Sequence, residues 1–380
     1  MKNGLIVWDH NEIPDDEIRA RIKTIQKSMR AENLDALIIF GDVNEAGAVS
    51  YFSYFAPYYF STALILTQTG EGIMTTVMAQ RGKPWIQSNS LIQDIRFQRN
   101  YGKGCSDVLK EIGLSYNRVG IVELDLFPYT ALLDLKKEFP HVEFIDVTDA
   151  INELRLIRSP VEINIISKAA QIADGAIEAV LRNWYFKKEC ELAGEIERQA
   201  RYRRCEDIFV HIASHAPGNR WLHLPTEQIL EQEVLVEVMV QLENYWAVIG
   251  RTILPHNPEP SLLHLKDSVE EFYSKAIKNI KSGVIVNDIF QGIREEVKND
   301  NIKLFSSIGF GLYVESMQRA WITDENQRGF NVPLKENMEV FFQLGLLDKK
   351  NYNKFLIQDT FIVGEREASQ CTKTQFVANY

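Results

Sequence analysis

The stretch Val234 to Thr252 reads VLVEVMVQLENYWAVIGRT and supplies two strand-like runs, 234–241 and 245–254. Both runs are rich in β-branched and aromatic residues, a composition that suits half-buried strands. Helical patterns follow at 265–280 and 288–298, and two further strand-like runs lie within MEVFFQLGL (339–346) and FLIQDTFIV (356–363). Helices over a curved antiparallel sheet form an α+β layer, which we predict for this part of the chain.

The first 150 residues show a different pattern, in which helices and strands alternate. Ile18, Ile22, Ile25 and Met29 recur at helical spacing within 16–32. The run LDALIIF then reads as a buried strand. Alternation of this kind predicts an α/β unit, a sheet covered by helices. The other elements expected there are strands at 62–66, 73–77, 119–122 and 142–145, and helices at 106–112 and 129–139.

The predicted boundary between the two parts lies within 149–159. Ser159 suits the N-cap of a helix and Pro160 its first position, so a long helix opens here and runs to about Asn183. A second helix at 189–203 and a strand at 208–213 follow. A length of 380 residues also favours two cores over one. We therefore predict an α/β domain over 1–150 and an α+β domain over 151–380.

Composition excludes several classes of protein. A formal net charge of -10 argues against nucleic acid and anionic membrane surfaces as partners. The start of the chain lacks the apolar run of a signal peptide, and no stretch approaches the roughly 20 apolar residues that span a bilayer. Four scattered cysteines fit a reducing compartment, so we expect a cytoplasmic protein.

Several short runs, taken in order, resemble the creatinase/aminopeptidase P superfamily (peptidase M24), whose catalytic domain is called the pita-bread fold. The resemblance covers nearly the whole chain. It implies a creatinase-type α/β domain followed by a pita-bread domain. The runs that carry it are ELR (153–155) with SPVEI (159–163), RT (251–252), KSG (281–283), GFGL (309–312) and MEVFFQLGL (338–346).

Metallopeptidases of this superfamily hold two divalent ions with two aspartates, a histidine and two glutamates, ligands that suit hard cations and a bridging water. The resemblance places the aspartate positions at Glu237 and Val248 and the histidine position at Ile308. The glutamate positions hold Gln343 and Gln358. Because Glu237 is the one anionic group among the five, the resemblance leads us to expect no metal and no cofactor.

Creatinase itself hydrolyses a small guanidino acid without metal, and the resemblance carries its histidine onto His223. An imidazole suits acid/base chemistry because its ordinary pKa lies near neutrality. Arg319 falls where creatinase clamps a substrate carboxylate, a task that suits a guanidinium. Glu315 falls at the second active-site histidine. The aromatic run at 51–62 is more typical of packing or a dimer surface than of a ligand cage.

We therefore expect a metal-independent, creatinase-like hydrolase that acts on a C–N bond (guanidino, ureido or amide) of a small polar metabolite. The alternative is a non-catalytic relative that binds a peptide or small ligand. The expected partners are a small-molecule substrate and, from the resemblance, a second copy in a homodimer. The predicted catalytic residues are His223, Glu237 and Glu315, and the predicted substrate-binding residues are Arg319, Arg251, Gln343, Gln358 and His215, with His211 a secondary candidate.

Overall fold

The computed structural model describes residues 7–57, 59–214, 221–297, 301–311, 322–323 and 333–375. The chain divides into two compact units, and the division falls between Leu156 and Ile157. Helix α6 (Thr148–Leu156) spans the boundary predicted at residue 150 and belongs to the first unit. The junction between the two units therefore lies after this helix.

The first unit is built on a sheet with the strand order β4-β3-β2-β1-β5-β6. Strand β1 pairs antiparallel with β2 and parallel with β5. Helix α1 (Asp15–Ala31) buries Ile18, Ile22 and Met29, as their helical spacing predicts. The strands are β1 (Ala36–Asp42), β2 (Ser61–Thr67), β3 (Ile73–Thr76), β4 (Ile95–Phe97), β5 (Arg118–Val122) and β6 (Glu143–Asp146), and the remaining helices are α2 (Gly47–Ser53), α3 (Lys83–Ser88), α4 (Tyr101–Ile112) and α5 (Tyr129–Glu138).

Helix α2 accounts for much of the aromatic run at 51–62. Tyr51 and Phe52 lie in this helix, Tyr54 and Phe55 follow it, and all four are buried. The guanidinium carbon of Arg21 lies 4.4 Å from the centre of the Tyr51 ring. These aromatic side chains therefore pack within the first unit.

Helix α7 (Pro160–Glu178) begins at the predicted residue and carries the predicted cap. The Ser159 hydroxyl oxygen accepts a hydrogen bond from the backbone N–H of Glu162 (3.3 Å). The Glu162 carboxylate in turn accepts one from the backbone N–H of Ser159 (2.8 Å). A reciprocal cap of this kind stabilises a helix by about 1 kcal/mol. The helix ends before the predicted Asn183.

The sheet of the second unit has the order β11-β10-β12-β13-β9-β8-β7 over the described residues. Its neighbouring strands pair antiparallel throughout. Strand β10 has no counterpart among the predicted strands. The strands are β7 (Asp207–Ser214), β8 (Val234–Leu242), β9 (Tyr245–Ile253), β10 (Ile302–Phe310), β11 (Ile322–Thr323), β12 (Glu339–Asp348) and β13 (Lys354–Ile362), with β14 (Ser369–Gln370) paired to β13.

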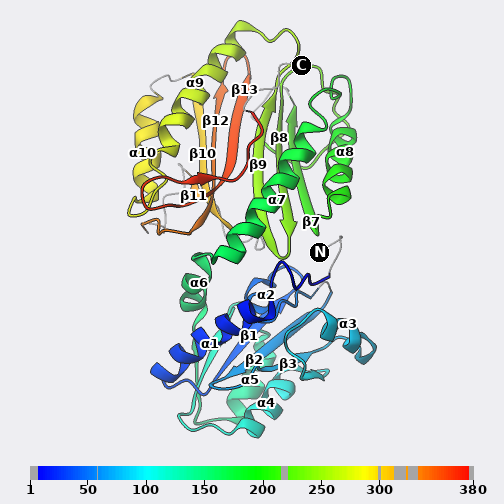
Figure 1. The fold of residues 1–380 in the computed structure, drawn as a ribbon, viewed down its shortest axis with the longest axis vertical. Coiled ribbons are helices and arrows are strands. Elements are labelled where there is room, and N and C mark those ends of the chain that lie inside the picture. Colours follow the sequence, from blue (N-terminus) through cyan, green and yellow to red (C-terminus); the bar gives the residue numbers. More distant parts are fainter. Residues whose placement is uncertain are drawn as a thin grey trace. The chain divides into compact units, whose positions relative to one another are not determined.

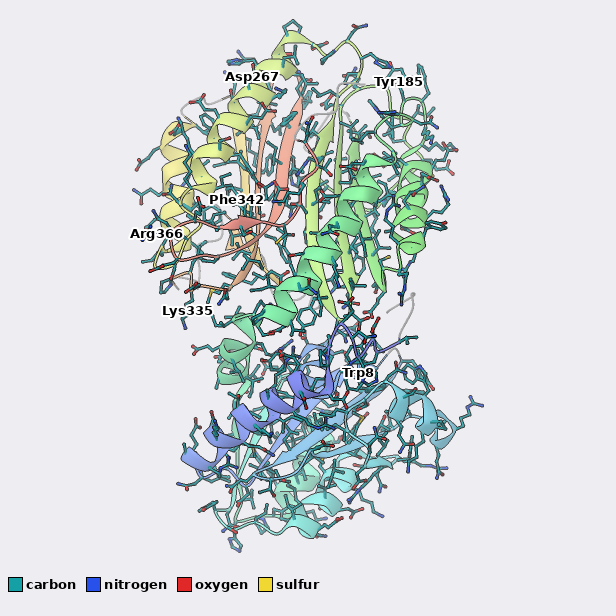
Figure 2. The ribbon with its side chains drawn as sticks, viewed as in Figure 1. Trp8, Tyr185, Asp267, Lys335, Phe342 and Arg366 are labelled. Atoms are coloured by element: carbon teal, nitrogen blue, oxygen red, sulfur yellow. The ribbon has the colours of Figure 1, made fainter. Side chains whose placement is uncertain are left out.

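Helices cover one face of this sheet (Figure 1). Helix α7 contacts β8 and β9, and α8 (Glu189–Tyr202) contacts β7. Helix α9 (Pro260–Ile277) contacts β12 and β13, and α10 (Val286–Glu296) contacts β10. The ring of Tyr273 in α9 stacks on Phe342 of β12, with centroids 5.2 Å apart. Figure 2 shows Phe342 within this layer, whereas the Asp267 side chain on α9 is 72% exposed.

Candidate functional site

One line of residues crosses the second sheet at a single register. His211 lies opposite Glu237, which lies opposite Gly250. Gly250 lies opposite Gln358, which lies opposite Gln343. Directly opposed residues of antiparallel strands project from the same face of a sheet, so these side chains line up across it. We call this line the polar row: His211, Glu237, Gly250, Gln358, Gln343, Ser307 and Thr323.

Apolar residues flank the polar row on both sides. Positions two residues away along a strand project from the same face, so these neighbours share the face of the row. The residues next to the row in sequence project the other way, toward α7 to α10, as Phe342 does. One flank consists of Phe209, Met239, Trp246, Val248 and Phe341, and the other of Ala213, Leu235, Leu356, Trp221 and Leu222.

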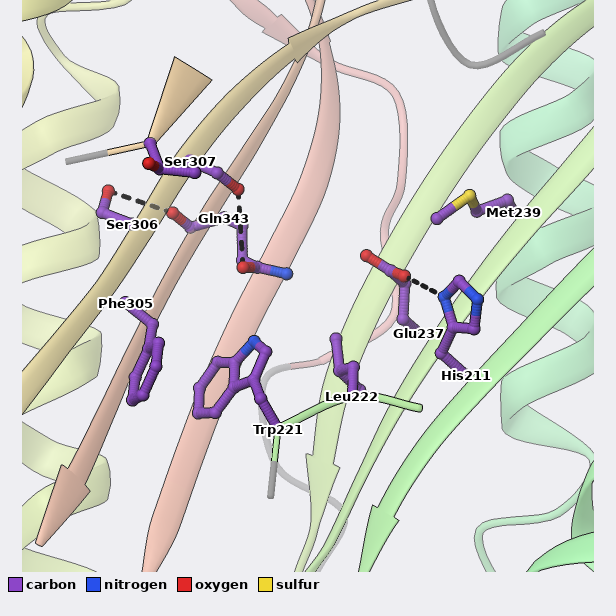
Figure 3. Close-up of a pocket in the computed structure, with 10 residues that line it drawn as sticks. His211, Trp221, Leu222, Glu237, Met239, Phe305, Ser306, Ser307 and Gln343 are labelled. Atoms are coloured by element: carbon purple, nitrogen blue, oxygen red, sulfur yellow. Dashed lines mark hydrogen bonds and ion pairs between the residues drawn. The ribbon is translucent and has the colours of Figure 1, made fainter. Parts of the chain in front are cut away.

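A pocket of about 360 Å³ opens over the polar row. Pockets for small ligands are typically apolar with a few convergent polar groups. Figure 3 shows the aromatic side chains of this pocket near one end and the imidazole and carboxylate at the other. The described residues that line it are His211, Trp221, Leu222, Glu237, Met239, Phe305, Ser306, Ser307, Thr323 and Gln343.

His211 and Glu237 form an ion pair at one end of the row. Nδ1 of His211 lies 2.7 Å from Oε2 of Glu237, and the Glu237 side chain is 6% exposed. The hydrogen bond that His211 donates to Glu237 raises the pKa of His211, although burial acts in the opposite direction. Oε1 of Glu237 has no hydrogen-bond partner among the described residues and points toward the centre of the pocket (Figure 3). The pair can therefore hold a proton beside a ligand.

Gln343 presents a side-chain amide from the opposite side of the pocket. Its Nε2 donates to Oε1 of Gln358 (3.2 Å), and its Oε1 accepts from the Ser307 hydroxyl (3.4 Å). In this arrangement the nitrogen of the amide is the donor and its oxygen the acceptor. The second hydrogen on Nε2 has no acceptor among the described residues. Gln343 therefore offers a donor to a ligand, while the fully buried Gln358 positions it.

Trp221 and Phe305 form the aromatic wall of the pocket. Their rings stack with centroids 4.0 Å apart and an angle of 16° between planes. The Lys303 ammonium lies 4.7 Å from the Phe305 centroid. The edge of the indole rests on Gly345, where an added Cβ would lie 2.6 Å from the Trp221 ring. The absence of a side chain at Gly345 therefore makes room for this wall.

Three of the predicted site residues come together in the polar row: Glu237, Gln343 and Gln358. Two of them, Glu237 and Gln343, line the pocket itself. His215, Glu315 and Arg319 lie outside the described residues, so the roles predicted for them stay predictions. His211, the secondary candidate, also lines the pocket, and the structure adds Trp221, Phe305 and Ser307 to the candidate site.

His223 lies near the pocket but is not among the described residues that line it. Its Nδ1 is 2.8 Å from the carbonyl oxygen of Leu224, and its Nε2 is 3.9 Å from Oε1 of Glu189. Burial tends to raise the pKa of Glu189, but hydrogen bonds from Ser214 and Thr226 lower it overall. The predicted acid/base role of His223 stays a prediction, and the geometry favours His211 for ligand contact.

Arg251 does not suit the substrate-binding role predicted for it. Its side chain is 1% exposed and is absent from the described lining of the pocket. Its Nη2 lies 2.6 Å from Oδ1 of Asp359, and its guanidinium also donates to the backbone oxygens of Gly250, Gln358 and Thr374. The physical reason is strand alternation, because Arg251 follows Gly250 of the row and so projects from the opposite face.

The comparisons with known proteins agree with this architecture. Residues 164–365 match the Metallopeptidase family M24, and residues 21–157 match the Creatinase/Prolidase N-terminal domain. The chain belongs to the M24 family. The fold is therefore the one expected, a creatinase-type α/β domain followed by a pita-bread domain.

Relatives match over almost the whole chain. An uncharacterised peptidase of Methanocaldococcus jannaschii is 26% identical over 95% of this chain and 97% of its own length. An Xaa-Pro dipeptidase of Pyrococcus horikoshii is 23% identical over 95% and 99%. The crystal structure of the prolidase from Pyrococcus horikoshii covers 94% of this chain and 99% of its own, with a TM-score of 0.75 and 22% identity.

These relatives correct the expected function. The creatinase of a Bacillus species is 23% identical over 78% of this chain and 74% of its own length, a smaller share than the Xaa-Pro dipeptidases. The prediction of a metal-independent, creatinase-like hydrolase is therefore wrong. Family members include peptidases and dipeptidases, which supports a hydrolase of peptide bonds. Over the described part of the chain, no helix is long and apolar enough to cross a membrane.

The family description, a metallopeptidase, implies bound metal ions. No group of three or more His, Cys, Asp or Glu side chains within the described ranges could hold an ion. Val248 and Ile308 are buried and carry no donor atom, and the amides of Gln343 and Gln358 bond to each other. Protein sites for such cations usually need three or more side-chain ligands. These residues do not fit a pair of divalent ions.

Proposed function

We propose that this chain is a hydrolase of short peptides that binds its substrate over the polar row. The observation that carries the proposal is the composition of the pocket, in which an aromatic wall faces a row of hydrogen-bonding groups. An amide group both donates and accepts hydrogen bonds, and Glu237 and Gln343 supply the matching acceptor and donor. Membership in a peptidase family supports the same class of substrate.

The aromatic wall suits the side chain of a bound peptide. The Trp221 and Phe305 rings lie in the same pocket as Leu222 and Met239, so apolar groups of a ligand lose contact with water there. The volume of about 360 Å³ suits a ligand of dipeptide size rather than a folded protein. The proposal therefore names short peptides with at least one apolar side chain.

The role of each residue follows from its contacts. Gln343 and Glu237 hold the amide of the substrate, and Gln358 and Ser307 orient Gln343. The His211–Glu237 pair holds a proton at Nδ1 of His211, next to the position of the amide. Trp221 and Phe305 exclude water from the apolar end of the pocket.

The test is a panel of dipeptides incubated with the purified chain. Binding is measured by isothermal titration calorimetry, and cleavage by mass spectrometry of the products, each with and without added Mn²⁺ or Zn²⁺. We expect binding and slow release of amino acids, both reduced in Gln343→Met. The matched control is Gln291→Met, because Gln291 lies exposed on α10. Absence of binding across the panel would refute the proposal, and binding without cleavage under every condition would refute hydrolysis.

A further inference from the structure

The polar row contains one donor and one acceptor that face each other across the pocket. The donor is the second hydrogen on Nε2 of Gln343, and the acceptor is Oε1 of Glu237. Figure 3 shows the Gln343 amide nitrogen and this carboxylate oxygen directed toward each other. Neither has a hydrogen-bond partner among the described residues. Both side chains line the pocket, so this pair of groups is available to a ligand bound there.

We infer that Gln343 and Glu237 together recognise one secondary amide of the ligand. Gln343 donates a hydrogen bond to the carbonyl oxygen of that amide, and Glu237 accepts one from its N–H. This inference rests on the proposed function and specifies which amides the pocket accepts. An amide nitrogen that carries a hydrogen satisfies both groups. A tertiary amide, such as the bond before proline, lacks that hydrogen and leaves Oε1 of Glu237 unpaired.

Gln358 and Ser307 orient the side-chain amide of Gln343. Ser307 donates to Oε1 of Gln343, and Gln358 accepts from its Nε2, an arrangement that leaves the second hydrogen on Nε2 for the ligand. Gln358 itself has no direct exposure to the pocket, because its side chain is 0% exposed. It is therefore a positioning residue, and Gln343 is the residue that touches the ligand.

Charge balance favours an amide N–H over an ammonium group on Glu237. The carboxylate is already paired with His211 at 2.7 Å, and that hydrogen bond favours the protonated imidazole. When the imidazole is protonated, an added ammonium would leave an excess positive charge in a site where Glu237 is 6% exposed, which is costly. A neutral N–H donor leaves the balance unchanged. The expected ligand is thus a peptide that the pocket recognises without its terminal amine.

The inference separates this chain from its named relatives. Proteins called Xaa-Pro dipeptidases are named for a bond whose nitrogen belongs to proline and carries no hydrogen. In the pocket of this chain, Oε1 of Glu237 would lie next to such a nitrogen and receive no hydrogen bond from it. We therefore expect Ala-Ala to bind more tightly than either Ala-Pro or Ala-Ala methylated on its amide nitrogen.

The experiment is a titration of these three dipeptides, and of N-acetylated Ala-Ala, into the chain and its variants. The wild-type chain is expected to favour Ala-Ala over the N-methylated peptide by about tenfold or more, since a hydrogen bond to a charged group is at stake. Glu237→Ala is expected to bring the two affinities within about twofold, and Glu237→Gln, whose amide oxygen still accepts, to restore part of the preference. Gln343→Met is expected to weaken both peptides by a similar factor, because both carry the carbonyl oxygen.

The outcomes separate failure of this inference from failure of the proposed function. If none of the peptides binds, the proposed function fails and the inference with it. If peptides bind but the wild-type chain does not distinguish N-methylated from unmethylated amides, only the inference fails. If Glu237→Ala still prefers the unmethylated peptide as strongly as the wild type does, the preference is steric and the inference is overturned. Loss of binding on N-acetylation, with N-methylation tolerated, would assign Glu237 to an ammonium and overturn it as well.

Discussion

Strands β9 and β13 carry two buried polar clusters that differ in one respect. On the face toward the helices, Arg251 and Asp359 are ion-paired, and Asp359 also accepts hydrogen bonds from Tyr273 and Thr372. On the other face, one residue earlier in each strand, lie Gly250 and Gln358 of the polar row. The first cluster is saturated with internal partners, whereas the row has hydrogen-bonding capacity left for a ligand. Buried polarity alone thus does not mark a functional site, but unused capacity does.

The largest expected effect lies in the saturated cluster. Asp359→Ala leaves the guanidinium of Arg251 buried without its counter-ion, and removing one partner of a buried pair typically costs about 3–5 kcal/mol. The free energy of unfolding from urea titrations measures this. We expect Gln343→Met, on the other face, to cost less, about 1–3 kcal/mol, because it leaves the buried Oε1 of Gln358 without its donor but leaves no charge unpaired. Equal losses in the two variants would remove the distinction between the faces.

The next effect concerns the aromatic wall. In Gly345→Ala the new methyl group meets the Trp221 ring at 2.6 Å, so the indole must move. Overpacking of this kind typically costs about 1–3 kcal/mol. We also expect peptide binding to weaken more than in Gly292→Ala, where an added Cβ has no neighbour within 4 Å. Calorimetry gives the affinities and thermal unfolding gives the stabilities. A Gly345→Ala protein that binds peptides normally would contradict the role of this wall.

A smaller effect depends on pH. Glu237 raises the pKa of His211 in the folded chain, so the pair adds stability that is fully present below the unfolded-state pKa of about 6.5. That stability is lost as pH rises through the raised folded-state pKa. We expect up to about 1 kcal/mol for this partly exposed pair. Unfolding curves between pH 5 and about 9 should show the slope in the wild type and not in His211→Asn. The same slope in both would assign it to another group.

The smallest effect is expected at Ser307. Its hydroxyl donates to Oε1 of Gln343 over 3.4 Å, a long hydrogen bond, so Ser307→Ala should cost only about 0.5 kcal/mol of stability. The preference for secondary amides should nevertheless fall, because Gln343 loses one of its two orienting contacts. Competition titrations with the N-methylated peptide measure that preference. An unchanged preference would show that Gln358 alone fixes the Gln343 amide.

Sequence reasoning predicted much of the second unit because its signals are local. Ser159 and Pro160 mark the start of α7, and strand-like composition marks β8, β9, β12 and β13. The polar row was not predictable, since it depends on how residues more than one hundred positions apart align across strands. Arg251 shows the limit most clearly. The motif of Arg251 and Thr252 helped to identify the family. Arg251 directly follows Gly250 in β9, however, so its side chain projects from the face toward the helices and not into the pocket.

His211 could have been ranked higher from the sequence. It lies in a strand of alternating character, four residues before His215, and a histidine on the face that carries Glu237 in the adjacent strand is a natural ion-pair partner. Trp221 and Phe305 carry no such local signal. Trp221 lies in the segment that precedes β8, and Phe305 lies in β10. The glycine that makes room for their stacking, Gly345, lies in a third element, β12.

The account depends most on the claim that the polar row holds a peptide amide. A calorimetric titration of Ala-Ala into the wild-type chain, Gln343→Met and Gln291→Met tests it most directly. We predict saturable binding with one site in the wild type and in Gln291→Met, and an affinity at least about threefold weaker in Gln343→Met, as expected for one neutral hydrogen bond. Equal affinities in all three proteins would contradict the account, because the peptide would then be held elsewhere.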